Sequence, residues 1–175
     1  MKETIETERL CLRPPRLADA QVVTNHVCDP RIYEKVARIP PRQTLQQSET
    51  WLRSAIHGRD LDTDHVYMIE LSGELVGSVG AHRRGQGETF EIGYWLAPSC
   101  WGRGIVTEAA AALIEELEAQ GKADTLVSGH FKDNPASARV LEKLGFSRDH
   151  EGLVYCLGRD AHIPHIYVVR TAKAG

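Results

Sequence analysis

One connection in this chain, Pro98-Ser99-Cys100-Trp101-Gly102-Arg103-Gly104, places two glycines between a β-rich segment and a long alanine-rich helical segment. Glycine adopts backbone conformations that other residues rarely adopt, so such a turn can gather main-chain N–H groups at a helix N-terminus. These unpaired N–H groups and the positive end of the helix dipole favour bound phosphate. The stretch from Trp101 to Val106 therefore predicts either a phosphate-binding turn or an ordinary tight strand-to-helix turn.

The residues around these glycines exclude two better-known phosphate loops. A nucleoside-triphosphate loop requires lysine and then serine or threonine after its last glycine, and no lysine follows Gly104. A dinucleotide fingerprint requires a further glycine at position 107, where this chain has Thr107. The turn therefore indicates a different phosphate-bearing ligand.

The order of the segments indicates a mixed fold. Three β-rich segments joined by short polar connections predict an antiparallel meander: residues 65–71, 75–82 and 89–96. Other strands are expected at 9–13, 125–131 and 165–170, and helices at 17–28, 45–57, 104–120 and 135–144. No repeat or linker divides the chain. We predict one α+β domain over residues 1–175, with a single mixed, mostly antiparallel sheet flanked by helices.

Length and composition fit a globular chain with one hydrophobic core. The 175 residues are 42% hydrophobic and 26% charged, and 21 basic against 24 acidic residues give a net charge of −3. Because these charges are spread along the chain, no nucleic-acid partner is expected. The N-terminus MKETIETERLCLRP lacks the apolar stretch of a signal peptide, and no run reaches the roughly 18 apolar residues of a membrane span. We expect a cytoplasmic protein without a membrane partner, as a monomer or homodimer.

The four cysteines are far apart in the sequence: Cys11, Cys28, Cys100 and Cys156. They form no C-x-x-C pair and have no histidine at metal-ligand spacing. We expect reduced thiols, as in a cytosolic protein, and no metal.

Three segments together resemble the GNAT superfamily of N-acetyltransferases. The run Glu91-Ile-Gly-Tyr-Trp-Leu-Ala-Pro98, followed by Trp101-Gly-Arg-Gly-Ile-Val-Thr-Glu-Ala109, looks like its acetyl-CoA segment, and residues 134–146 resemble its second signature. The opening, Glu6-Thr-Glu-Arg-Leu-Cys-Leu-Arg-Pro14, resembles the RimJ/RimL-like branch that contains ribosomal-protein alanine N-acetyltransferases. The resemblance covers nearly the whole chain in the right order, and it implies an enzyme that acetylates a primary amine.

The resemblance implies acetyl-CoA as co-substrate, with its pyrophosphate on the main-chain amides of Trp101, Gly102, Arg103, Gly104, Ile105 and Val106. It also implies that the strand holding Tyr94, Trp95 and Leu96 splays from the next strand, so that its free main-chain groups pair with the pantetheine arm as an added strand would. Two positions depart from the family pattern, because Trp101 replaces the usual Gln or Arg and Val106 the usual Gly or Ala. Main-chain amides are retained at both positions.

The second signature opens with Asn134-Pro135, an N-cap followed by a first-turn proline. The resemblance adds a hydrogen bond from Asn134 to the pantetheine arm. Lys143 can reach the phosphates of CoA, although a cation late in a helix also suits the negative end of the helix dipole.

Many GNAT enzymes carry a tyrosine, the acid that protonates the CoA thiolate, where this chain has Leu141. Ser137 lies one helical turn earlier on the same face. In the ribosomal-protein branch a serine at this position is the suggested general acid, and the alternative is a hydroxyl that bonds to local backbone.

Glu91 is the first candidate for a general base, acting through water, and the alternative is a solvated strand-end carboxylate. His82 and His130 are weaker candidates. Glu108 is expected to favour the helix dipole. No metal is required, because the amine can attack the thioester directly while a main-chain N–H near Trp95 and Leu96 holds the oxyanion.

The acceptor is the least constrained part of the prediction. A protein N-terminal α-amino group has a pKa of about 8 and a lysine about 10.4, so the former needs only a weak base. The resemblance favours that acceptor, while a polyamine or antibiotic amine stays open, as does a non-catalytic acyl-CoA sensor. We expect the first 60 residues and a loop at 149–166 to shape the acceptor pocket.

Overall fold

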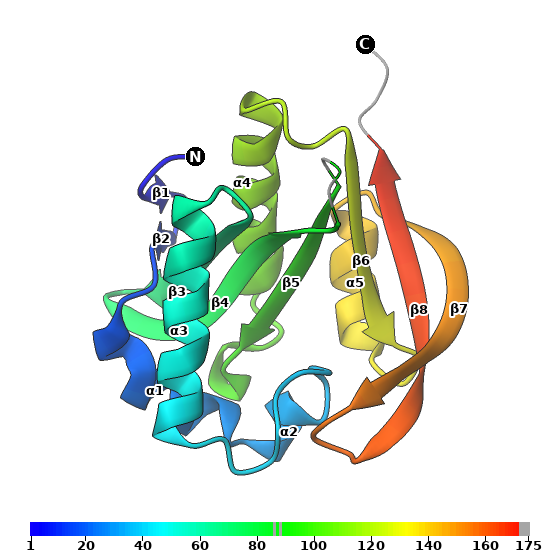
Figure 1. The fold of residues 1–175 in the computed structure, drawn as a ribbon. Helices are drawn as coiled ribbons and strands as arrows, with labels where there is room; N and C mark the ends of the chain where they lie inside the picture. Colours follow the sequence, from blue (N-terminus) through cyan, green and yellow to red (C-terminus); the bar gives the residue numbers. More distant parts are fainter. Residues whose placement is uncertain (86, 88, 172–175) are drawn as a thin grey trace.

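The computed structural model describes residues 1–85, 87 and 89–171, and the chain forms an eight-stranded mixed sheet flanked by helices (Figure 1). The strands are β1 (Ile5–Glu6), β2 (Leu10–Arg13), β3 (Asp64–Leu71), β4 (Glu74–Arg83), β5 (Phe90–Leu96), β6 (Thr125–Phe131), β7 (Ser147–Cys156) and β8 (Ala161–Thr171). The helices are α1 (Ala20–Val27), α2 (Pro30–Tyr33), α3 (Leu45–Asp60), α4 (Ile105–Ala119) and α5 (Pro135–Lys143). Among these, no helix is long and apolar enough to cross a membrane.

The sheet has the order β1-β2-β3-β4-β5-β6-β8-β7, and of these eight strands, as far as the structure describes them, only β5 and β6 pair in parallel. The predicted mixed, mostly antiparallel sheet is therefore confirmed. Helix α4 makes the crossover between β5 and β6, because parallel strands cannot be joined by a hairpin. The single parallel pair lies at the centre of the sheet and borders the site described below.

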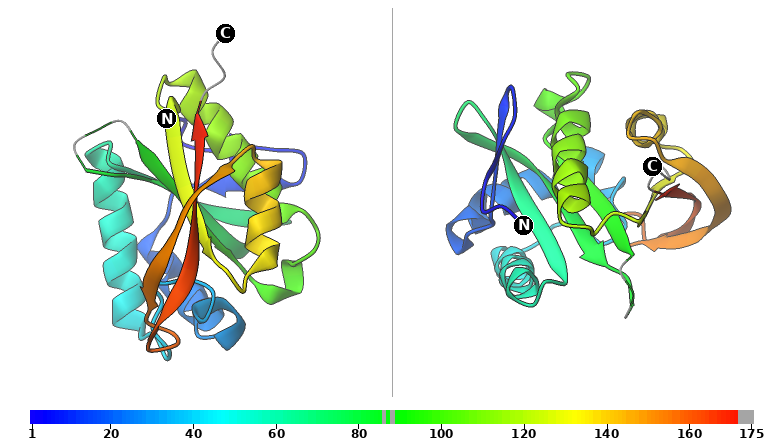
Figure 2. Two further views of the ribbon diagram at one scale, coloured as in Figure 1. Left: turned by 90° about the vertical axis from the view of Figure 1, so that its right-hand side faces the viewer. Right: turned by 90° about the horizontal axis from the view of Figure 1, so that it is seen from above.

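Helices cover both faces of the sheet, with α1 and α3 on one side and α4 and α5 on the other (Figure 2). Side chains alternate along each strand, so Val79 and Ala81 of β4 pack in the core under α4. Trp95 of β5 packs on the other face, against α1 and α3. Leu52 is fully buried and Trp51 partly buried, as the spacing of α3 predicts.

The β5 and β6 strands separate soon after they meet, as Figure 1 shows. Among the residues that the structure describes, they pair only at Phe90 with Leu126 and at Glu91 with Val127. Beyond these pairs Ser128 Oγ donates to the main-chain oxygen of Ile92 at 2.8 Å. Meanwhile β5 stays paired with β4 as far as Leu96. The splay expected from the resemblance is therefore present.

The sequence prediction was wrong for residues 149–166, which are not a loop. They belong mostly to β7 and β8, a hairpin whose turn includes Asp160 with a φ of 48°. Strand β7 contains Arg148, Asp149 and Glu151, which are poor strand formers. It forms because β8, paired with β6 along Thr125–Phe131, offers β7 a complete edge. Backbone pairing therefore overrides the local preference.

Two short elements escaped the sequence analysis. Strand β1 has two residues, and α2 is a single turn in which Asp29 caps the N–H of Arg31. In the structure Cys11, Cys28, Cys100 and Cys156 form no disulfide.

Candidate active site

A cleft of about 1110 Å³ opens where β5 and β6 separate. Its lining comes from both faces of the sheet, because Tyr94 and Leu96 of β5 border the α4 side, whereas Gly93 and Trp95 border the α1 and α3 side. Of the site residues predicted from the sequence, all but Arg103 line this cleft: Glu91, Tyr94, Trp95, Leu96, Trp101, Gly102, Gly104, Ile105, Val106, Asn134, Ser137 and Lys143.

The glycine turn has the left-handed geometry that its sequence predicts. Gly102 has a φ of 73° and Gly104 a φ of 75°, values that a residue with a side chain rarely adopts. Gly104 directly precedes α4, whose first N–H groups, on Ile105, Val106 and Thr107, have no partner within the helix. This cradle of main-chain donors faces the cleft and fits a pyrophosphate.

Trp101, the unusual first residue of the turn, forms a hydrogen bond that stabilises the turn. Its indole Nε1 donates to the main-chain oxygen of Leu96 at 2.8 Å, while the residue remains 47% exposed. The aromatic ring therefore ties the end of β5 to the start of the turn, a role that the sequence did not reveal.

The edge of β5 that faces the splay offers main-chain groups to a ligand. The Ala97 N–H donates to the main-chain oxygen of Val76 in β4. Since bonding direction alternates along a strand, the N–H groups of Leu96 and Tyr94 point to the splay instead. The pantetheine amides of acetyl-CoA fit such an edge, and the Leu96 N–H is the candidate oxyanion donor.

Helix α5 presents Asn134, Ser137 and Lys143 to the opposite wall of the cleft. Asn134 is the predicted N-cap, because its Oδ1 accepts from the Ser137 N–H at 3.3 Å. Leu141, at the position of the absent family tyrosine, is buried in the core. The cap occupies Oδ1 and leaves the Asn134 side-chain NH2 as a further donor.

Tyr94 supplies a phenol to Ser137 from across the cleft. The Tyr94 Oη lies 2.8 Å from Ser137 Oγ, and either oxygen can be the donor. Burial raises the pKa of Tyr94 to about 12, against the smaller opposing effect of its bond to Ser137. The phenol therefore stays protonated at neutral pH. Sequence reasoning assigned Tyr94 a main-chain role only and missed this contact.

The apex of the splay collects titratable side chains. Glu91, the expected base, forms an ion pair with Arg84 and stands opposite His82 in the register of β4 and β5. His165 of β8 also lines the cleft, and burial, followed by the charge of His130, lowers its pKa. The structure thus brings Glu91 and three imidazoles into one cleft.

Glu108 binds residues of the N-terminal segment. Its carboxylate accepts from Thr7 Oγ1 at 2.6 Å and from Arg9 Nε at 2.6 Å. Burial opposes ionisation, yet these bonds hold the pKa of Glu108 below its usual value. Arg9 also donates to the main-chain oxygen of Arg103 at 2.9 Å, so this pair anchors the N-terminal strands to the outer side of the glycine turn.

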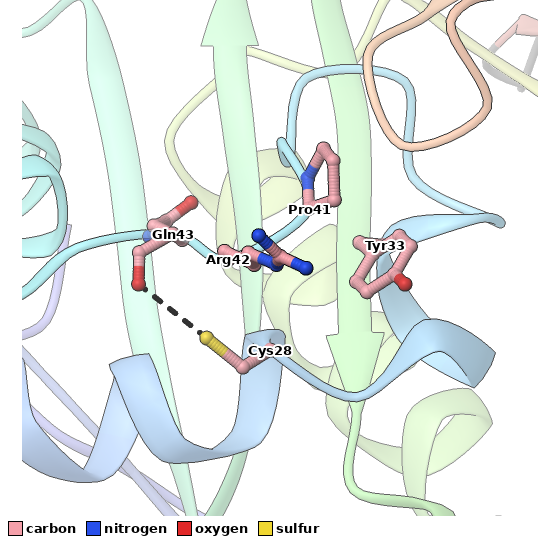
Figure 3. Close-up of a pocket in the computed structure, with 5 residues that line it drawn as sticks. All are labelled: Cys28, Tyr33, Pro41, Arg42 and Gln43. Atoms are coloured by element: carbon pink, nitrogen blue, oxygen red, sulfur yellow. Dashed lines mark hydrogen bonds between the residues drawn. The ribbon is translucent and has the colours of Figure 1, made fainter.

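A smaller hollow adjoins the cleft at Gln43 (Figure 3). It is lined by Cys28, Tyr33, Pro41, Arg42 and Gln43, and Cys28 Sγ donates to the Gln43 oxygen at 3.4 Å. These five lining residues include neither carboxylate nor imidazole. The acid–base groups belong to the larger cleft.

Comparison with known proteins agrees with this geometry. Residues 9–147 match the acetyltransferase (GNAT) domain family. The chain is 31% identical over 139 residues to the ribosomal-protein-serine acetyltransferase of Escherichia coli K12, covering 71% of this chain and 75% of that one. It is 28% identical over 156 residues to the uncharacterized N-acetyltransferase p20 of Bacillus licheniformis, covering 87% and 85% of the two chains.

Solved structures share the fold. RimL, a ribosomal L7/L12 α-N-protein acetyltransferase in complex with coenzyme A, has a TM-score of 0.87 at 20% identity, with 99% of this chain and 100% of that chain covered. The microcin C7 self-immunity acetyltransferase MccE, in complex with acetyl-CoA and AMP, has a TM-score of 0.83 at 19% identity, with 95% and 94% covered. With the family match across residues 9–147, the chain belongs to the GNAT family and is an acetyl-CoA-dependent N-acetyltransferase.

Proposed function

We propose that this enzyme acetylates the N-terminal α-amino group of a protein by direct transfer from acetyl-CoA. The observation that carries the proposal is the position of the cleft at the splay, where it borders both faces of the sheet. The glycine turn and α5 can hold acetyl-CoA on one face, while the amine enters over Gly80 and Gly93 from the other. Both substrates then meet beside β5, and no acetyl-enzyme is needed.

The charge of the cleft bears on the acceptor. Among its described lining residues, five are lysine or arginine and two carry carboxylates: Arg31, Lys35, Arg38, Arg139 and Lys143 against Glu34 and Glu91. This excess suits the phosphates of CoA and repels a polyamine. An N-terminus followed by neutral or acidic residues fits it better.

The relatives support a protein acceptor. The E. coli relative is named for a ribosomal-protein serine, and RimL for the α-amino group of L7/L12. An α-amino group is also the easier nucleophile, because at pH 7.5 roughly a quarter is neutral, against about one in a thousand lysines. The four free thiols fit a reaction in the reducing cytoplasm.

In the proposed reaction the neutral amine attacks the thioester carbonyl, the N–C bond forms and the C–S bond breaks. Ser137 gives its proton to the departing thiolate, and Tyr94 Oη, 2.8 Å away, returns a proton to the serine. Leu96 N–H holds the oxyanion, Asn134 bonds to the pantetheine arm and Lys143 binds the phosphates of CoA. Glu91 stays a candidate base, although its carboxylate is paired with Arg84.

Thiol release from acetyl-CoA tests the acceptor across one panel of amines. The panel holds free N-terminal peptides with acidic or basic second residues, N-terminally blocked lysine peptides, spermidine and an aminoacyl adenylate. Preferential turnover of the free peptide with an acidic second residue is expected. Turnover of spermidine or of the adenylate alone would move the assignment to a small amine. The panel includes an adenylate because the MccE structure holds AMP. If no amine in the panel causes thiol release, the proposed protein acceptor has no support.

A further inference from the structure

Gly58, near the end of α3, makes room for a carboxylate beside the cleft. A glycine within a helix is less favourable than an alanine, so its presence needs a local reason. A Cβ at position 58 would lie 2.4 Å from Asp64 Oδ2 and 2.7 Å from Asp64 Cβ. The absent side chain therefore provides the space that Asp64 occupies at the start of β3.

The Asp64 carboxylate is held through both oxygens. Thr63 Oγ1 donates to Oδ2 at 2.9 Å, and Oδ1 lies 2.5 Å from Nδ1 of His82. A carboxylate only accepts, so His82 Nδ1 must carry the proton, and the neutral ring then has its lone pair on Nε2. Asp64 thus fixes the tautomer in which Nε2 accepts a proton.

The His82 ring leans back along β4 toward the cleft. A Cβ at Gly80 would lie 3.0 Å from Nε2, so this nitrogen stands over Gly80. Gly80 pairs directly with Gly93 of β5, where an added Cβ would meet no described atom within 4 Å. The two glycines form an open floor beside Nε2. Within residues 1–85, 87 and 89–171, Nε2 has no hydrogen-bond partner, whereas the Glu91 carboxylate is paired with Arg84.

We infer that His82, oriented by Asp64, is the general base that takes the proton of the acceptor amine over Gly80 and Gly93. The inference rests on amine acetylation as proposed above, but on no particular acceptor. As the N–C bond forms and the C–S bond breaks, an amine proton passes to His82 Nε2 and the thiolate takes the proton of Ser137. Asp64 is then a positioning residue that acts through His82.

The substitution His82→Asn isolates the proposed base. The asparagine amide can replace Nδ1–H toward Asp64, but it has no counterpart of Nε2. We expect kcat/KM at pH 7 to fall roughly 10²-fold, the usual loss of a general base, with little change in the Kd of acetyl-CoA. Glu91→Gln should lose less. His150→Asn is the matched control, because its Nδ1 also pairs with an aspartate, Asp149, at 2.8 Å, on exposed β7.

The pH profile separates a base from a structural histidine. In the wild type, log(kcat/KM) should rise at low pH with a slope approaching two, one proton from the amine and one from His82. His82→Asn should reduce this slope to one, and Glu91→Gln should leave it at two. The charged groups facing His82 are Asp64 on β3 and Glu91 on β5, the latter with Arg84. His165 lies in the same cleft, and burial lowers its pKa.

A spectroscopic reading needs no acceptor at all. Nitrogen-15 shifts of His82 should report a neutral ring protonated on Nδ1 in the wild type. Asp64→Asn and Gly58→Ala, which displaces Asp64, should both mix the tautomers and lower kcat/KM. If Gly58→Ala fails to fold, Asp64→Asn is sufficient to test the effect of Asp64 on the His82 tautomer.

Two outcomes would overturn the assignment of His82. One is undiminished turnover of His82→Asn together with a large loss in Glu91→Gln, and the other is an Nε2-protonated ring in the wild type. The measurements of kcat/KM and of its pH dependence use whichever amine the wild type acetylates. A wild type that acetylates only a small amine would contradict the protein acceptor and leave the test of His82 intact.

Discussion

Tyr94 Oη and Ser137 Oγ lie 2.8 Å apart and join the splayed strand β5 to helix α5 across the cleft. The two residues are separated by 43 positions in the sequence, so neither motif alone reveals the contact. The pair places a phenol next to the serine although the tyrosine position of the family, here Leu141, is buried in the core.

Ser137→Ala should lower kcat by roughly 10²-fold or more while the Kd of acetyl-CoA changes little, because the hydroxyl acts on the developing thiolate. Tyr94→Phe should lower kcat less, by roughly tenfold, since water can return the proton to the serine. The double variant should be no slower than Ser137→Ala, because both residues serve one proton path. Additive losses in steady-state kinetics would separate the two residues, and undiminished turnover of Ser137→Ala would leave the serine with a structural role.

Gly104→Glu should abolish acetyl-CoA binding without unfolding the protein. The substitution adds a negative charge beside the pyrophosphate cradle and strains a φ of 75°. Gly121→Glu is the matched control, because Gly121 has a φ of 68° and open space around it at the far end of α4. Calorimetry should show lost affinity only for the variant at 104. Unchanged affinity there would refute the cradle.

Trp101→Phe should raise the Kd of acetyl-CoA by about fivefold, the equivalent of one hydrogen bond of about 1 kcal/mol. Phenylalanine keeps the aromatic ring but loses the indole N–H that bonds to the Leu96 oxygen at 2.8 Å. The end of β5 and the turn then move more freely. Equal affinities of the two proteins by calorimetry would show that the bond does not order the turn.

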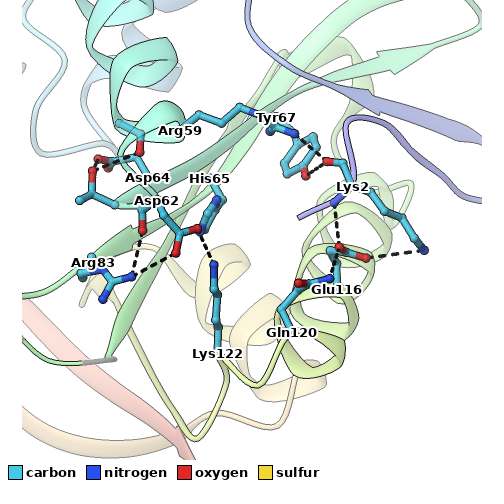
Figure 4. Close-up of polar contacts among 12 residues, drawn as sticks. Lys2, Arg59, Asp62, Asp64, His65, Tyr67, Arg83, Glu116, Gln120 and Lys122 are labelled. Atoms are coloured by element: carbon cyan, nitrogen blue, oxygen red, sulfur yellow. Dashed lines mark hydrogen bonds and ion pairs between the residues drawn. The ribbon is translucent and has the colours of Figure 1, made fainter.

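His65 should make the fold sensitive to mild acid. It is 1% exposed beside Asp62, Lys122 and Arg83 (Figure 4), and burial, followed by the charge of Lys122, lowers its pKa to about 4. The unfolded chain binds this proton near pH 6.5, so stability is complete above that pH and falls as the pH drops from about 6.5 to about 4, by up to about 3 kcal/mol. In urea unfolding, the free energy of unfolding of His65→Leu should change less between pH 7.5 and pH 5 than that of the wild type. An equal change in both proteins would exclude His65 as the cause.

Much of this architecture was predictable because its causes are local. The positive-φ glycines at 102 and 104, the Asn134 cap and the order of helices and strands along the chain follow from backbone preferences and sequence patterns that neighbouring residues already encode. The β7–β8 hairpin was not predictable, since β7 depends on an edge supplied by β8 rather than on its own residues. The contact between Asp64 and His82 was hidden for a related reason. It depends on the missing side chain at Gly58, which lies just beyond the helix expected at 45–57 and is part of α3 in the structure.

The central pair of strands has a mechanical consequence. The sheet is continuous on either side of β5 and β6, whereas the described residues of these two strands are joined by only the Phe90–Leu126 and Glu91–Val127 pairs and the Ser128 bond to Ile92. A co-substrate that bonds to the free edge of β5 and also contacts α5 adds contacts between the two parts of the sheet that meet at β5 and β6. We therefore expect bound acetyl-CoA to strengthen the junction between β5 and β6, so that this part of the sheet resists local unfolding more before CoA leaves than after it.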